Sequence, residues 1–395
     1  MQHTFASKQE VKSVYIHVPF CLSKCHYCDF YSEAASESRI NQWHETILTE
    51  MRLNFSAALA GDFNKGSLET IYYGGGTPSI VPPSFYAEQL KYLDDLFGIA
   101  ENAEITIEAN PGVIPPLSLY RTTGFNRISF GFQSASDKLI QIMGRRTKAK
   151  AFIKDIAEAQ KADFDRICAD IMIGLPGQSL QDVNETLDLI FSLPIGHVSY
   201  YSLTLSEGTP FWNRYAHNQE LLPGEDLERK MYDLTLQRLS DEGMIPYEIS
   251  NAARIGEKSR HNQVYWLADS YMGLGPSAHS YLGGTRYGNP ASLQQWSQLV
   301  NKPDSSNIRT CLPGHVEEIV DESAARAETM ILGLRLLQGV EYDNFFHRHN
   351  IDLRLLYPRQ IARLSERELI VQDDSGIRLT RLGLDLANQV FLEFI

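Results

Sequence analysis

The first 205 residues alternate between short apolar segments typical of strands and longer amphipathic segments typical of helices. One such helix follows Ser179, where Ser179 and Asp182 form a capping-box pattern. Strands that alternate with helices form a mostly parallel sheet, so an α/β domain is predicted. By spacing alone, a partial barrel and an open doubly wound sheet both fit. The six strand candidates, rich in Ile, Val, Tyr and Phe, are 14–18, 70–73, 104–108, 127–132, 166–173 and 197–203.

Polar residues lie at the ends of these strand candidates. Cys21 follows the first and residues 74–77 follow the second. Glu108 and Gln133 end the next two, and Asp170 lies within the fifth. Ligands of parallel α/β proteins bind at the carboxyl ends of the strands. The sequence therefore predicts that these groups meet at one mouth of the sheet.

Three of the five cysteines lie within eight residues, as Cys21-x3-Cys25-x2-Cys28. In a reducing compartment, such clustering indicates metal or redox chemistry, not a disulfide framework. Iron–sulfur clusters usually take four protein thiolates, so three local ones leave one iron open to a small molecule. Cys168 or Cys311 could supply a fourth thiolate, although the apolar surroundings of Cys168 predict a buried thiol.

The main alternative for the triplet is a zinc site completed by His17 or His26. The spacing of the three cysteines favours an iron–sulfur cluster over zinc.

Charge and hydropathy exclude several classes of function. The net charge is −13, which argues against nucleic acid as the main partner because phosphate binding needs a basic face. No run of eighteen apolar residues appears, so no integral membrane segment is expected. The first fifteen residues lack the apolar core of a signal peptide, and we expect a cytoplasmic location.

Beyond residue 205 the pattern changes. Residues 206–300 are less regular, with a helix candidate at 225–242, and they form an extension of the core. The last part, 301–395, predicts a small winged-helix-like domain. Its candidates are helices at 323–337 and 353–366, a hairpin of 369–372 with 377–379, and a helix after Thr380. The predicted domains are thus 1–205, 206–300 and 301–395.

The cysteine triplet, together with Gly74-Gly75-Gly76-Thr77-Pro78 after the second strand, resembles the radical S-adenosylmethionine (SAM) superfamily. The resemblance implies a partial (β/α)6 TIM-like barrel with a [4Fe–4S] cluster on Cys21, Cys25 and Cys28. It also implies that the open iron binds the amino and carboxylate groups of SAM. One electron from the cluster would then cleave SAM to methionine and a 5′-deoxyadenosyl radical, while the protein positions the cofactors.

Further positions match, in order, the SAM contacts of the oxygen-independent coproporphyrinogen III oxidase-like family. The match implies that Arg145 pairs with the SAM carboxylate and that Gln133 and Asp170 suit the ribose hydroxyls. Each residue alone has an ordinary structural explanation, and no catalytic residue is assigned. The implied SAM residues are Tyr15, Tyr27, Gly75, Gly76, Thr77, Glu108, Gln133, Arg145 and Asp170.

In two features the sequence resembles one branch of that family, the HemW heme chaperones. Phe30 stands where the oxidases carry an additional cysteine, and residues 261–266 read His-Asn-Gln-Val-Tyr-Trp, the His-Asn-x-x-Tyr-Trp motif of the HemW family. The resemblance implies heme binding at His261, Tyr265 and Trp266, with an electron donor and an apo-hemoprotein recipient as partners. Neutral imidazole is a common axial ligand of heme iron.

Three alternatives stay open at this point. His261 could be a hydrogen-bonded structural residue, with the two aromatic side chains in the core. The chain could instead be a coproporphyrinogen III oxidase, which decarboxylates its substrate to protoporphyrinogen IX in porphyrin biosynthesis. Radical opening of a heme ring would use the same parts.

Overall fold

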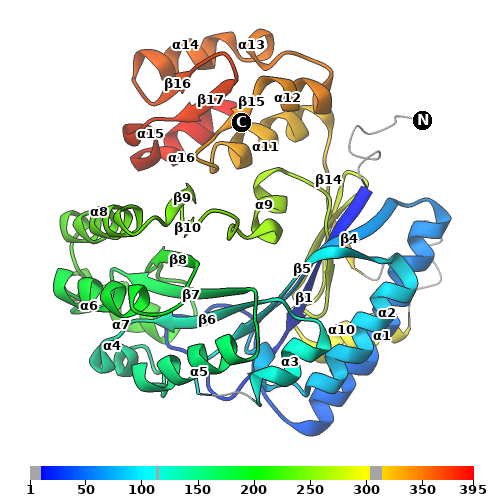
Figure 1. Ribbon diagram of the computed structural model, residues 1–395. Coiled ribbons are helices and arrows are strands. Elements are labelled where there is room, and N and C mark those ends of the chain that lie inside the picture. The colour runs from blue at the N-terminus through cyan, green and yellow to red at the C-terminus, as the bar shows by residue number, and fades with distance from the viewer. Residues whose placement is uncertain (1–9, 113–114, 303–313) are drawn as a thin grey trace.

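The computed structural model describes residues 10–112, 115–302 and 314–395. Its centre is a nine-stranded sheet in the order β11-β1-β4-β5-β6-β7-β8-β10-β9, curved as Figure 1 shows. The six predicted strands form its middle and all run parallel, so the prediction is confirmed. They are β1 (Glu10–Val18), β4 (Asn64–Gly75), β5 (Ile99–Ala109), β6 (Arg127–Gln133), β7 (Arg166–Ile173) and β8 (His197–Ser202).

Helices connect these strands and cover one side of the curved sheet (Figure 1). The capping box predicted at Ser179 is present, because Ser179 and Asp182 each accept a hydrogen bond from the other's backbone N–H. Alternate strand residues such as Val14 and Ile16 are fully buried in the core. The connecting helices are α1 (Glu37–Ala60), α2 (Pro83–Phe97), α3 (Leu117–Thr123), α4 (Asp137–Ile142), α5 (Ala149–Lys161) and α6 (Leu180–Phe191).

Both edges of the sheet come from the irregular region after residue 205. β11 (Met272–Leu274) lies parallel to β1 at one edge. β10 (Asn251–Ala253) and β9 (Ile245–Glu248) add antiparallel strands beside β8 at the other edge. Among the described residues the two edges do not pair with each other, so the sheet is an open, barrel-like one. The proposed division at residues 205 and 300 stays a prediction.

The C-terminal residues form a separate small core, drawn at the top of Figure 1. It begins with α11 (Glu322–Gly333), β15 (Val340–Glu341) and α12 (Tyr342–His349). The predicted hairpin is confirmed as β16 (Ile370–Gln372) paired with β17 (Gly376–Leu379).

The helix predictions in this part differ from the structure in one length and in two divisions. The first helix ends at Gly333 instead of residue 337. The second is split into α13 (Leu353–Leu356) and α14 (Pro358–Glu366), because Pro358 disfavours a helical backbone at Tyr357. The predicted final helix is likewise divided, into α15 (Arg381–Asp385) and α16 (Ala387–Phe391).

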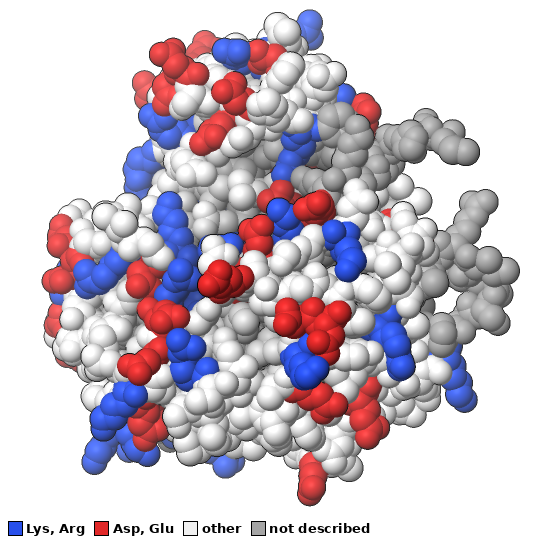
Figure 2. Space-filling model, turned by 45° about the vertical axis from the view of Figure 1, so that its right-hand side comes forward, with Lys and Arg blue, Asp and Glu red and all other residues white. Residues whose placement is uncertain are grey.

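The distribution of charged side chains on the surface agrees with the argument against nucleic acid as the main partner. On the face shown in Figure 2, basic and acidic side chains are interspersed, without a broad basic area. No helix among the described residues is long and apolar enough to span a membrane.

Candidate cluster and SAM site

The cysteine loop follows β1 and opens onto a pocket at the carboxyl ends of the parallel strands. Cys21, Cys25 and Cys28 are partly exposed free thiols, and all three line the pocket. Thr77 Oγ1 lies 3.6 Å from Cys21 Sγ, and Arg145 Nη1 lies 3.7 Å from Cys25 Sγ. Burial raises the pKa of the Cys28 thiol to about 11.

The geometry does not fit a zinc ion. Both ring nitrogens of His17 are occupied, Nδ1 by the Tyr15 hydroxyl at 3.0 Å and Nε2 by the Tyr31 carbonyl at 2.9 Å. His26 Nδ1 is bonded to the Ile142 carbonyl at 2.9 Å. In the described part of the chain, no three His, Cys, Asp or Glu side chains are arranged to hold one metal ion. A cubane cluster takes each thiolate on a different iron, so the three thiols need not converge on a point.

The fourth thiolate can also be assessed. Cys168 is 1 % exposed within β7 and does not line the pocket, which confirms the prediction of a buried thiol. Burial raises its pKa to about 12. Cys311 lies outside the described residues. Among the described cysteines, Cys21, Cys25 and Cys28 line the pocket and Cys168 does not.

The pocket beside the thiols has a volume of about 370 Å³, which suits a small-molecule ligand. Two implied SAM residues are not on its surface. Tyr15 lies behind it against His17, and Thr77 is 3 % exposed beneath Cys21. The implied SAM residues on its surface are Tyr27, Gly75, Gly76, Glu108, Gln133, Arg145 and Asp170.

Arg145 is fixed by acceptors on three sides. Its guanidinium donates to the Tyr27 hydroxyl at 3.2 Å, to the Gly131 carbonyl at 2.6 Å and to the Asn110 side chain. Both terminal nitrogens of the guanidinium are thereby held in place at the pocket wall.

The glycines after β4 are required by what lies beneath them. Gly75 has φ +108°, and a Cβ there would come within 2.4 Å of the His17 ring. A Cβ on Gly76 would come within 2.6 Å of the Phe20 carbonyl oxygen. The strand end is therefore pressed against the cysteine loop, and only glycine keeps this part of the pocket open.

Glu108 sits next to the glycines. It accepts hydrogen bonds from the Tyr72 hydroxyl at 2.7 Å and from the Gly75 N–H at 3.1 Å. The pKa of Glu108 is raised to about 7, chiefly by burial and also by the nearby charge of Asp170, while the two hydrogen bonds partly oppose the rise. Glu108 therefore changes its charge close to neutral pH.

Gln133 and Asp170 complete the polar wall. Gln133 has φ +72°, a left-handed conformation that residues with a Cβ adopt mostly where the surroundings enforce it. Asp170 accepts a hydrogen bond from the Ser129 hydroxyl at 3.1 Å, and burial raises the pKa of Asp170.

The His-Asn-x-x-Tyr-Trp motif forms α9 (Arg260–Trp266), away from the thiols. His261 is 1 % exposed, and both ring nitrogens are bonded, Nδ1 with Thr70 Oγ1 at 2.8 Å and Nε2 with the Tyr265 hydroxyl at 2.9 Å. Its ring stacks on Tyr72 at 5.1 Å, and burial lowers the pKa of His261 to about 3. His261 thus has the contacts of a neutral structural histidine, and binding iron would break a hydrogen bond.

Comparisons with known proteins agree with this architecture. Residues 15–190 match the radical SAM superfamily, and residues 320–386 match the HemN C-terminal domain. The chain is 33 % identical to the heme chaperone HemW of Bacillus subtilis, over 98 % of this chain and 99 % of that protein. It is 32 % identical to the heme chaperone HemW of Lactococcus lactis, over 98 % of each chain. The chain belongs to the HemW family.

The fold is also that of a solved structure, coproporphyrinogen III oxidase (HemN) from Escherichia coli. The TM-score is 0.81 at 20 % identity, covering 99 % of this chain and 91 % of that one. At this identity the likeness concerns the fold alone. Membership of the HemW family within the radical SAM superfamily implies a [4Fe–4S] cluster and SAM, and the resemblance drawn from the cysteine triplet is confirmed.

The sequence reasoning missed one residue that joins the parts of the pocket. Asn110 lines the pocket, accepts from Arg145 and donates to Thr77 Oγ1 at 2.8 Å. It directly follows β5, so the rule applied to Glu108, a polar group at the carboxyl end of a parallel strand, could have found it.

Proposed function

We propose that this protein binds heme and delivers it to apo-hemoproteins, and that a cluster on Cys21, Cys25 and Cys28 with SAM beside it serves this role. The observation that carries the proposal is the identity with heme chaperones over nearly the whole chain. The pocket at the strand ends, with three thiols at its edge, supports the cofactor part.

Each group of the pocket has a proposed task. The cluster, when bound, supplies the electron that cleaves SAM. Arg145 holds the SAM carboxylate, and Gln133 and Asp170 bind the ribose hydroxyls. Gly75 and Gly76 leave room for the amino-acid part, with Glu108 beside them.

Three of the implied residues act from outside or at the edge of the pocket. Tyr27 holds Arg145 through its hydroxyl. Thr77 supports Cys21, and Tyr15 supports His17 under the glycines.

The partners follow from this chemistry. The cluster needs an electron donor, and heme needs a recipient protein. A reducing compartment keeps the three thiols available, so we propose a cytoplasmic location. On α9, the residue that contacts heme is Trp266. His261 and Tyr265 hold that helix in place through hydrogen bonds.

The test is anaerobic incubation of the cluster-loaded protein with SAM, a reductant and either heme or coproporphyrinogen III, followed by chromatography. We expect heme to remain intact, to bind and to move to an added apo-hemoprotein, with no protoporphyrinogen formed. Conversion of coproporphyrinogen, without heme transfer, would show that the proposal is wrong.

A further inference from the structure

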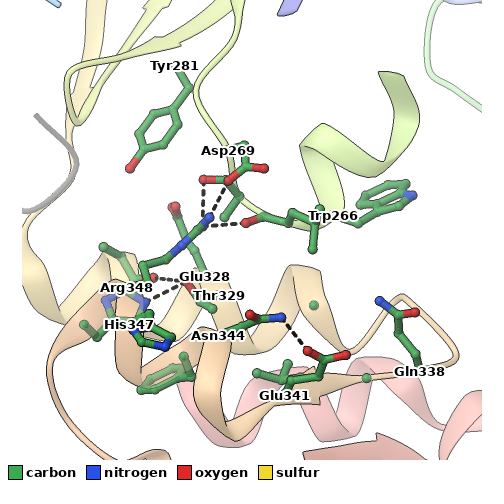
Figure 3. A pocket seen from close by; sticks show the side chains of 18 residues that line it. Trp266, Asp269, Tyr281, Glu328, Thr329, Gln338, Glu341, Asn344, His347 and Arg348 are labelled. Atoms are coloured by element: carbon green, nitrogen blue, oxygen red, sulfur yellow. Dashed lines mark hydrogen bonds and ion pairs between the residues drawn. The ribbon is translucent and has the colours of Figure 1, made fainter. Parts of the chain in front are cut away.

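A second pocket lies between α9 with the segment after it and the C-terminal helices α11 and α12. Its volume is about 610 Å³, and none of its lining residues lines the SAM pocket. Figure 3 shows Trp266, Asp269 and Tyr281 on one wall and Asn344, His347 and Arg348 on the other. The volume lies within the range of about 300–1,000 Å³ that is usual for cofactor and ligand sites.

We propose that this pocket is the heme site and that His347 is the iron ligand. The inference rests on the proposed heme-binding function and assigns it a place. It moves the ligand from His261, inside the family motif, to a histidine of the C-terminal unit.

Availability of the imidazole favours His347. It is exposed at the end of α12, and no described residue forms a hydrogen bond with its ring. His349, on the same helix, is buried with Nε2 bonded to Thr329 Oγ1 at 2.9 Å. His261 is buried with both nitrogens bonded. An iron atom can therefore bind His347 without breaking a hydrogen bond. Binding at Nε2 of His349, or at either ring nitrogen of His261, would break one.

The walls suit a flat, mostly apolar macrocycle. Trp266 contributes partly exposed aromatic surface, and Tyr281, Val340 and Phe345, each at most 6 % exposed, complete the apolar lining. The Arg335 guanidinium lies 4.4 Å from the centre of the Trp266 ring and holds it by a cation–π contact. Large rigid side chains bury much ligand surface at little cost in conformational entropy.

Charge does not oppose the assignment. Of the carboxylates on the lining, Asp269 is paired with Arg348, and Glu328 lies 2.7 Å from Arg286. Glu341, hydrogen-bonded by Asn344, is exposed. The exposed side chains mark the mouth, where the heme propionates can remain in water. An iron ligand at the mouth of the pocket also suits a heme that is transferred to another protein, because the recipient protein can approach the iron from that side.

The family motif keeps a role in this arrangement. His261 is bonded to Tyr265, and the next residue, Trp266, forms part of the wall. His261 is therefore a positioning residue, and its loss weakens heme binding without removing the iron ligand. Affinity alone cannot distinguish the two histidines, but the coordination spectrum can.

The experiment is a heme titration of the anaerobic, cluster-loaded protein, followed by Soret difference spectra and the resonance Raman iron–histidine stretch of the reduced heme. We expect His347→Ala to bind about tenfold more weakly and to lose the histidine signature, which added imidazole restores. His217→Ala, at another exposed histidine, should match wild type. Ala325→Phe, which fills the pocket from α11, should also weaken binding. His261→Gln should keep the histidine signature.

Several results would overturn the assignment. One is a wild-type spectrum and affinity in His347→Ala. Another is unchanged binding in Ala325→Phe. A third is loss of the histidine signature in His261→Gln while His347→Ala retains it. If the wild-type protein itself shows no saturable heme binding, the proposed function fails, whereas heme binding that ignores the pocket variants refutes only this inference.

Discussion

Glu108 gives the sharpest prediction about the SAM pocket, because its charge changes near neutral pH. Burial raises the pKa from the ordinary 4.5 to about 7. This value includes the charge of Asp170, which also raises the pKa, and the hydrogen bonds from Tyr72 and Gly75, which lower it. Glu108→Gln keeps the size and one acceptor oxygen but removes the titration.

The first consequence concerns stability. The pKa is higher in the folded than in the unfolded state, so the folded state holds the proton more tightly. The resulting stabilisation is complete below about pH 4.5 and is lost as the pH rises through about 7. At about 1.4 kcal/mol per pH unit, the loss is at most about 3.5 kcal/mol, and water in the pocket reduces it. In Glu108→Gln without SAM, this part of the pH dependence should disappear.

The second consequence concerns SAM. Its sulfonium carries a positive charge, so SAM should bind best when Glu108 is ionised. About one tenth of the carboxyl is ionised at pH 6 and about nine tenths at pH 8, so SAM affinity should rise about tenfold between them. Glu108→Gln should bind SAM weakly and with a flat pH profile.

Glu50 provides the matched control. It is a 1 % exposed carboxyl that accepts from the Gly275 N–H and from Asn289, both at 2.7 Å, and burial raises its pKa to about 7 as well. Glu50→Gln should therefore remove a similar part of the pH-dependent stability and leave the pH profile of SAM binding unchanged.

Denaturant midpoints between pH 5 and pH 8 measure the stability part, and anaerobic equilibrium dialysis with labelled SAM measures the affinity. The reasoning is refuted if wild-type SAM affinity is the same at pH 6 and pH 8. It is also refuted if Glu108→Gln retains the tenfold change.

Three further predictions concern other parts of the molecule. Arg145→Ala should lower SAM affinity about tenfold to a hundredfold in equilibrium dialysis, because a charge-assisted contact is lost, and an unchanged affinity would exclude the assigned contact. Cys25→Ala should lose the iron and the broad visible absorption of the reconstituted cluster while circular dichroism stays that of the folded protein; retained absorption would contradict the ligand set. Ser179→Ala should cost about 1 kcal/mol in chemical denaturation through the lost capping box, with SAM affinity unchanged, and a neutral result would show that α6 does not need its cap.

The main strands could be predicted because their signal is local. A mostly buried strand such as β7 (Arg166–Ile173) is largely apolar, and its bounds were predicted as the structure has them. β9, β10 and β11 have three or four residues each and are strands only because β11 pairs with β1, β10 with β8 and β9 with β10. Nothing in so short a segment distinguishes it from a loop, so the edges of the sheet could not be read from the sequence.

The candidate site was partly readable for a similar reason. Strand ends place Glu108, Gln133 and Asp170 at one mouth whatever the sheet curvature. Whether a side chain faces the pocket depends on what packs against it. Tyr15 lies behind the pocket, where its hydroxyl is bonded to His17, and the bond of His17 with the Tyr31 carbonyl requires the folded cysteine loop.

The strand β4 (Asn64–Gly75) links the two pockets through side chains on one face. Thr70 and Tyr72 are two residues apart in the strand and therefore point to the same side. Thr70 is bonded to His261, and Tyr72 stacks on His261 while its hydroxyl donates to Glu108 in the SAM pocket. The helix that carries Trp266 is thus anchored on the strand whose end frames the SAM site. The wall supplied by α9 depends on β4 and the opposite wall on the C-terminal helices, so the second pocket exists only where both units are present.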